Sequence, residues 1–118
     1  MSERDEGLYL VDMLAAARTA LHYIHGRARA DLENDGMLRD AVVRQLEVLG
    51  EAASHVSEAT RTRSGDVPWR GIVGMRNVLI HAYHRVDNDE VWAALQGELP
   101  AVESGKSGGF CPESLADG

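Results

Sequence analysis

Apolar residues in this sequence recur every three or four positions through three long stretches, which is the spacing of one face of an α-helix. Aromatic residues make up only 5% of the 118 residues, and this composition disfavours β-sheets. The sequence therefore predicts an all-α protein. The three stripes are Val11, Leu14, Leu21 and Ile24; Leu38, Val42, Leu46, Leu49, Ala53 and Val56; and Ile72, Met75, Leu79 and Ala82.

The stripes and the turn residues between them predict where the first helices begin and end. We expect a frayed end over residues 1–6 and a first helix over residues 8–26. The stretch Asp31–Gly36 is typical of a turn-rich break or a short helical turn. A long second helix is then expected over residues 37–60.

Proline and aspartate mark the boundaries in the second half of the chain. After a loop over residues 61–67, Pro68 suits the first turn of a helix, where its missing N–H has no cost. Asp87 is a good N-cap for a last helix, which Pro100 is expected to end. The remaining residues 101–118 are rich in glycine and serine, so they predict a flexible tail after one domain over residues 1–100.

Gly50 stands in the middle of the second helix, where glycine costs roughly 1 kcal/mol relative to alanine. The best explanation is that another helix passes close by at this point. Glu47 and Glu51 lie on one face of the same helix. They could hold an arginine from the helix over residues 68–83, or they could be exposed helix charges.

The helix over residues 68–83 carries polar side chains beside its apolar stripe. Arg76 and Tyr83 are seven positions apart and share one stripe, whereas Asn77 and His81 are four apart and share another. Arginine presents a planar, permanently charged fork that matches phosphate. Histidine can move protons near neutral pH. Together, these side chains could bind a phosphate and move a proton, which are the two requirements of a catalytic site for phosphate chemistry.

The net charge of −7 argues against a general nucleic-acid binder, but the charge is unevenly distributed. Residues 61–85 hold five arginines against one acid, so the only basic segment contains the candidate site. We therefore take Arg70 and Arg85 as candidate substrate-binding residues. Arg61 and Arg63 have an alternative role near a helix C-terminus, where the helix dipole stabilises cations.

The sequence predicts a cytoplasmic protein without a cofactor or a metal. No run of about 18 apolar residues could span a membrane, and the charged start of the chain lacks an apolar signal region. Cys111 is the single cysteine, so there is no disulfide framework. His22 and His25 lie one helical turn apart, but no third ligand follows at a suitable spacing.

The pattern Arg-x4-His-x-Tyr formed by Arg76, His81 and Tyr83, with Asn77 after the arginine, resembles the motif of the HEPN superfamily. The surrounding sequence is similar to the HepT-like (DUF86) branch over roughly residues 8–100. The segment Arg44–Ala52 resembles a second motif of that branch, in which Gln45 replaces the usual asparagine.

This resemblance implies a HEPN-like antiparallel bundle of four to five helices. It also implies that the chain is the toxin of a type VII toxin–antitoxin pair. In this role it would be a ribonuclease with Arg76 and His81 as its catalytic pair. HepT-like proteins are encoded beside a minimal nucleotidyltransferase, MntA, which transfers AMP to the tyrosine of the motif, here Tyr83. The resemblance finally implies homodimers in which the two motifs face one cleft and form a composite active site.

The chemistry of such a site needs no metal. A base that removes the proton of a ribose 2′-OH lets this oxygen attack the adjacent phosphate, and an arginine stabilises the developing negative charge. Asn77 could orient the histidine or hold a phosphate oxygen. The expected products are a 2′,3′-cyclic phosphate and a 5′-OH, and DNA should not be cut because it lacks the 2′-OH.

The geometry of a regular helix leaves this assignment incomplete. Arg76 and His81 are five positions apart, so they point about 140° away from each other. The helix could distort near its C-terminus, the long arginine could reach around, or two chains could each supply part of the site. A non-enzymatic partner that binds nucleotide or RNA for a nucleotidyltransferase is the alternative function, and a purely helical assembly module is a third.

Overall fold

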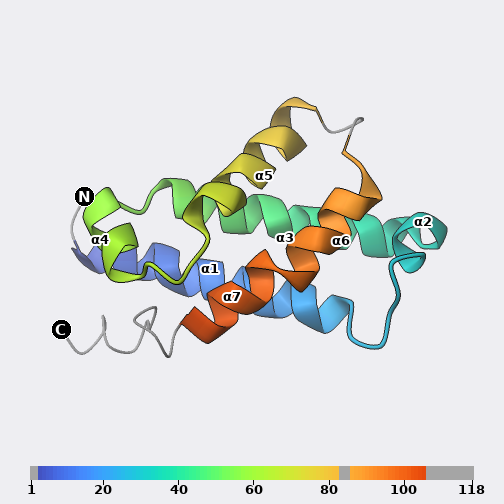
Figure 1. Ribbon diagram of the computed structural model, residues 1–118, viewed down its shortest axis with the longest axis horizontal. Coiled ribbons are helices and arrows are strands. Elements are labelled where there is room, and N and C mark those ends of the chain that lie inside the picture. Colours follow the sequence, from blue (N-terminus) through green and yellow to red (C-terminus); the bar gives the residue numbers. More distant parts are fainter. Residues whose placement is uncertain (1–2, 83–85, 106–118) are drawn as a thin grey trace.

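The structure is a computed structural model that describes residues 3–82 and 86–105, and all of its regular elements are helices (Figure 1). Five of these helices have eight residues or more and two are shorter, which confirms the predicted all-α bundle. No helix in these two ranges is long and apolar enough to cross a membrane. The helices are α1 (Glu3–Tyr23), α2 (Asp31–Asn34), α3 (Gly36–Ser54), α4 (Glu58–Arg63), α5 (Trp69–His81), α6 (Asn88–Gln96) and α7 (Glu98–Gly105).

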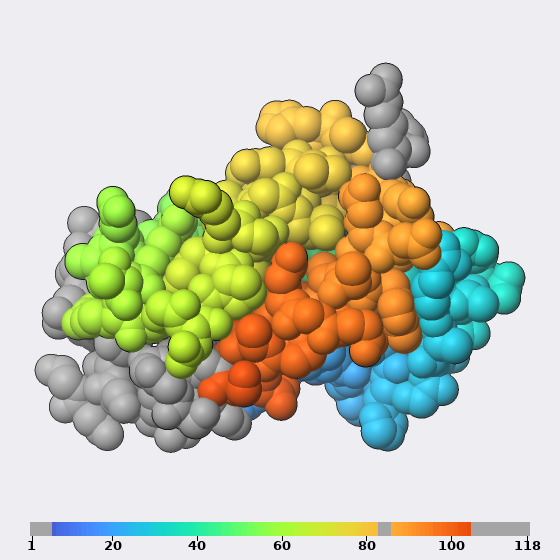
Figure 2. Space-filling model, in the orientation of Figure 1, coloured from blue at the N-terminus to red at the C-terminus, as the bar shows by residue number. Residues whose placement is uncertain are grey.

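The two longest helices, α1 and α3, run antiparallel side by side and form the centre of the bundle (Figure 1). Their facing sides are lined by buried residues that include Leu10, Met13, Val42 and Leu49. Helix α5 packs chiefly on α3, and α7 packs on α1. The C-terminal end of α5 stands at the upper edge of the molecule (Figures 1 and 2).

The long helix predicted over residues 37–60 is wrong, because the chain breaks it at His55–Ser57. Helix α3 ends at Ser54, and Ser57 begins a new helix by accepting a hydrogen bond from the N–H of Thr60 at 3.3 Å. Glu6 of α1 reinforces this break. Its carboxylate accepts from the N–H of Ser57 at 2.6 Å and from the hydroxyl of Thr60 at 2.5 Å.

The frayed end predicted over residues 1–6 is wrong for residues 3–6, whereas residues 1 and 2 lie outside the described residues. Helix α1 already begins at Glu3, and the side chain of Glu6 is only 6% exposed. The hydrogen bonds from Thr60 and Ser57 favour the charged carboxylate, so they lower the pKa of Glu6 below its ordinary value. The first part of α1 is therefore tied to the α3–α4 junction by the ionised side chain of Glu6.

This tie predicts a stability loss in acid. Because the folded-state pKa of Glu6 is lowered, its contribution is complete above the ordinary glutamate pKa and is lost as the pH falls through the folded-state value. Glu6→Gln should lower the free energy of unfolding at pH 7 by about 1–3 kcal/mol and flatten its dependence on pH below 5. Urea unfolding at pH 7 and pH 4 measures this, and an equal acid slope in both proteins would contradict it.

The last part of the bundle starts as predicted but ends later. Asp87 caps α6 by accepting a hydrogen bond from the N–H of Asp89, as expected. The prediction that Pro100 ends the last helix is wrong, because a proline in the first turn of α7 needs no intrahelical N–H partner. Leu99 and Val102 are buried, and this apolar contact stabilises α7, which ends at Gly105. A flexible tail stays a prediction for residues 106–118, which lie outside the described residues.

Candidate functional site

Helix α5 is anchored at its start by a tryptophan and an arginine. Pro68 is the N-cap residue, and the buried Trp69 donates its indole N–H to the carbonyl oxygen of Ser64 at 3.0 Å. The guanidinium of Arg61 lies over the Trp69 ring, 5.6 Å from its centre, and donates to the carbonyl oxygen of Ala53 at 2.9 Å. Arg61 thus connects the start of α5 to the end of α3, which is a structural role.

Arg61 and Arg63 both lie in the last turn of α4, which confirms the alternative of cations near a helix C-terminus. Arg70 is exposed in the first turn of α5, about 9 Å along the helix axis from Arg76. Its substrate-binding role stays a prediction. Tyr83 and Arg85 lie outside the described residues, and their predicted roles stay predictions too.

The crossing of α3 and α5 occurs at Gly50, as the sequence predicted. A Cβ atom built on Gly50 would lie 2.1 Å from the Cβ and 2.8 Å from the Cγ of Arg76, and 3.1 Å from the carbonyl oxygen of Ile72. Real Cβ atoms do not approach other atoms this closely. Gly50 therefore admits the stem of Arg76 against the backbone of α3, at a distance that no other residue permits.

The head of Arg76 is held by two side chains. Its Nη2 donates to Oε2 of Glu51 at 2.6 Å, and its Nη1 donates to Oδ1 of Asn77 at 2.9 Å. The buried Nε of Arg76 has no hydrogen-bond partner among the described residues. Glu51 is therefore the acid that holds the motif arginine, whereas Glu47 pairs with Arg44 of its own helix at 4.0 Å.

Glu51 has a second partner that the sequence analysis missed. Its Oε1 lies 3.1 Å from Nε2 of His55, and the ring of His55 stacks on Tyr9 of α1, with 4.9 Å between ring centroids and 16° between planes. The bonds with His55 and Arg76 lower the pKa of Glu51. The four-residue spacing of Glu51 and His55 was a signal for this pair, but nothing in the sequence pointed to Tyr9.

His81 is the last residue of α5, and its side chain is exposed. The helix is regular from Trp69 to this point, so it does not distort to bring His81 toward Arg76. Arg76 does not reach around either, because it is bonded to Glu51 on α3. Asn77 is bonded to Arg76 rather than to His81. Neither of the two ways of forming the site within one chain is therefore present in the described residues.

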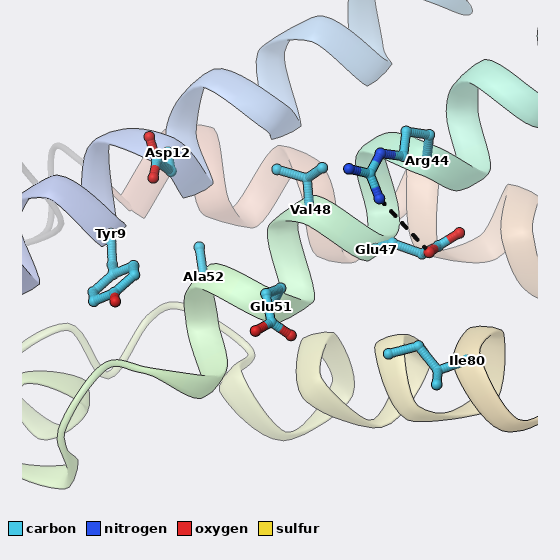
Figure 3. A pocket seen from close by; sticks show the side chains of 8 residues that line it. All are labelled: Tyr9, Asp12, Arg44, Glu47, Val48, Glu51, Ala52 and Ile80. Atoms are coloured by element: carbon cyan, nitrogen blue, oxygen red, sulfur yellow. Dashed lines mark ion pairs between the residues drawn. The ribbon is translucent and has the colours of Figure 1, made fainter.

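A groove of about 420 Å³ opens beside this cluster, between α1, α3 and the end of α5 (Figure 3). Glu51 points from α3 toward α5, and Ile80 closes the groove on the α5 side (Figure 3). Three carboxylates and a single arginine line it, so the groove itself suits a polyanion poorly. Its lining residues are Tyr9, Asp12, Arg44, Glu47, Val48, Glu51, Ala52 and Ile80.

The described parts of the chain contain no group of three His, Cys, Asp or Glu residues placed to hold a metal ion. The chemistry available at the end of α5 is that of a histidine exposed to solvent and an arginine held in one orientation. These groups can move a proton and stabilise a negative charge.

The sequence also matches a known family. The family model described as Ribonuclease HepT-like matches residues 13–105, which is most of the chain. The chain belongs to the HepT-like family. This HepT-like match extends through α7, five residues beyond the domain boundary predicted at residue 100.

Relatives of this HepT-like chain cover nearly its whole length. The Methanocaldococcus jannaschii protein named "Putative RNase MJ1380" is 33% identical over 103 residues, which are 87% of this chain and 94% of that protein. The Caldanaerobacter subterraneus protein named "Putative RNase TTE0752" is 34% identical over 95 residues, 80% of this chain and 85% of that one. The Thermococcus cleftensis protein named "Probable ribonuclease HepT" is 30% identical over 95 residues, 80% and 86% of the two chains. No solved structure matches the chain.

Proposed function

We propose that this HepT-like chain is a metal-independent ribonuclease whose catalytic pair is Arg76 and His81. The observation that carries the proposal is the fixed orientation of Arg76, which Gly50, Glu51 and Asn77 hold on the helix that ends in an exposed His81. Membership of the HepT-like family supports it, as do relatives that carry ribonuclease names.

In the proposed reaction, a proton leaves the ribose 2′-OH and this oxygen attacks the adjacent phosphorus. The bond to the 5′-oxygen of the next nucleotide breaks, and that oxygen takes up a proton. His81 moves one of these protons, and the guanidinium of Arg76 stabilises the charge that develops on the phosphate oxygens. Asn77 contributes by holding Arg76, and Arg70 and Arg85 bind the phosphates of the flanking nucleotides.

The test uses purified protein with bulk RNA in EDTA. Cleavage that leaves 2′,3′-cyclic phosphate and 5′-OH ends, with no cleavage of the DNA of the same sequence, supports the proposal. RNA that is bound but left intact by protein shown by mass to be free of AMP would overturn it. That result would favour the alternative, a non-enzymatic RNA- or nucleotide-binding partner of a nucleotidyltransferase.

The active form in this proposal is a homodimer with composite sites. The regular helix and the bonded Arg76 support the third arrangement, in which Arg76 of one chain meets His81 of the other. Val78 and Ile80 lie in the last turn of α5 and are 41% and 47% exposed. A second chain that docks at this end of the helix would cover them. Full activity at dilutions where sedimentation shows only monomer would contradict the dimer.

We further propose that the chain is the toxin of a type VII toxin–antitoxin pair and that an MntA-like nucleotidyltransferase silences it by transferring AMP to Tyr83. Tyr83 lies two positions after His81 in the sequence. AMP would therefore add bulk and negative charge beside the place where an RNA phosphate must bind.

This switch predicts the behaviour of Tyr83→Phe. The variant should cleave RNA but gain no AMP, so incubation with the nucleotidyltransferase and ATP leaves its activity unchanged, whereas the wild type loses its activity. Intact-mass measurement and the cleavage assay follow the two effects together. Loss of activity in Tyr83→Phe that requires a catalytically competent nucleotidyltransferase would refute the assignment of this tyrosine.

A further inference from the structure

A continuous chain of side-chain contacts reaches from α1 to the motif arginine. The ring of Tyr9 stacks on His55, His55 bonds to Oε1 of Glu51, and Oε2 of Glu51 bonds to Arg76. Three elements take part, because Tyr9 lies on α1, Arg76 lies on α5, and His55 is the residue that caps the end of α3.

The direction of the hydrogen bond between His55 and Glu51 follows from their chemistry. The lowered pKa of Glu51 keeps it ionised, and a carboxylate can only accept. Nε2 of His55 must therefore carry a hydrogen and donate the hydrogen bond to Oε1 of Glu51. The two oxygens of Glu51 are then divided, with Oε1 bonded to His55 and Oε2 bonded to Arg76.

Glu51 needs this second partner because its side chain is 53% exposed. A half-exposed ion pair is a weak restraint, and a free glutamate side chain samples several rotamers. His55 narrows the choice of rotamers by binding the second oxygen of Glu51, and the stacked ring of Tyr9 supports the ring of His55, which is 42% exposed. The orientation of Arg76 therefore depends on a residue that does not contact it.

We propose that His55 is a positioning residue for Arg76, acting through Glu51 with Tyr9 as the support of its ring. This inference rests on the proposed ribonuclease function for its catalytic consequence. His55 contacts neither RNA nor the reacting atoms. Its effect is to keep the guanidinium in the place where phosphate charge develops, so it raises the rate of the chemical step rather than the affinity for RNA.

Two substitutions separate the two properties of His55. His55→Phe keeps an aromatic ring on Tyr9 but has no donor for Glu51, and His55→Gln keeps a donor but has no ring. His25→Phe is the matched control, because His25 is exposed in the turn after α1, outside the contact chain. Thermal unfolding of each variant shows whether it is folded.

The first measurement does not depend on activity. ¹⁵N NMR of the guanidinium groups reports hindered rotation when an arginine head is held, and the Arg76 signal is assigned by its loss in Arg76→Lys. We expect the hindered Arg76 signal in the wild type and in His25→Phe, and its loss in His55→Phe. A retained hindered signal in folded His55→Phe would overturn the proposal, whether or not the protein cleaves RNA.

The second measurement is the kinetics of RNA cleavage. Loss of the single donor should lower kcat by roughly 5- to 10-fold in His55→Phe, with KM within about twofold of the wild type. His55→Gln should recover part of kcat, because its amide can donate to Glu51. A rise in KM with kcat unchanged would overturn the positioning role. If the wild type itself cleaves no RNA, the proposed function fails, and the NMR result alone decides the role of His55.

Discussion

His81→Ala should reduce RNA cleavage by about 10²- to 10⁴-fold, the usual contribution of a general acid or base. The fold should be unaffected, because His81 is the exposed last residue of α5. The measurement is the cleavage of bulk RNA in EDTA, with the ends of the products identified. Protein purified identically is essential, because a trace of a contaminating ribonuclease would mask the loss.

The matched control is His25→Ala, which removes an exposed histidine in the turn after α1. It should cleave as the wild type does. Equal cleavage by His81→Ala and the wild type would show that the activity comes from a contaminant or from a site elsewhere on the chain. A loss of cleavage in His25→Ala as large as in His81→Ala would show that the assay does not report on α5.

Gly50→Ala should destabilise the fold, because the added methyl group would lie 2.1 Å from the Cβ of Arg76. That atom is attached to the backbone of α5, so only a shift of one helix against the other can relieve the contact. We expect a loss of about 1–3 kcal/mol in the free energy of unfolding, as for other overpacked cores. Urea unfolding measures it.

Gly74→Ala is the control for this substitution. Gly74 lies within α5, and a Cβ atom built on it meets nothing within 4 Å. The same change should therefore be neutral or should stabilise the protein by up to about 1 kcal/mol, since alanine favours helix over glycine. Equal stability of the two variants would contradict the close crossing of α3 and α5. Gly50→Ala should also lose cleavage, because a shifted α5 separates Arg76 from Glu51.

Much of this arrangement could be predicted from local sequence patterns. The apolar spacing predicted the helices, and Asp87 predicted a cap, because both signals lie within a few residues of the structure that they specify. Gly50 predicted a close crossing because a glycine inside a helix needs a reason beyond its own helix. Glu51 could be named as a partner of an arginine, although the alternative of an exposed charge was equally open.

The parts that the sequence did not predict depend on residues far apart in the chain. The break between α3 and α4 is fixed by Glu6, 51 positions before Ser57, and the ring under His55 comes from Tyr9. The apolar stripe runs without interruption through Ala53 to Val56, which lies inside the break, so it gave no warning. A proline after an apolar helix predicts a helix end at Pro100, but the position of Pro100 in a first turn depends on where α7 begins.

The proposed active site combines Arg76 of one chain with His81 of another. The direct test is to coexpress Arg76→Ala with His81→Ala, each expected to be inactive alone, in equal amounts and to purify all of the dimers together, without separating mixed from unmixed ones. If the site is shared, a random mixture should regain about a quarter of the wild-type activity, because half of the dimers are mixed and each has one intact site. If each site lies within a single chain, the mixture would remain as inactive as the two variants, and that result would contradict the account.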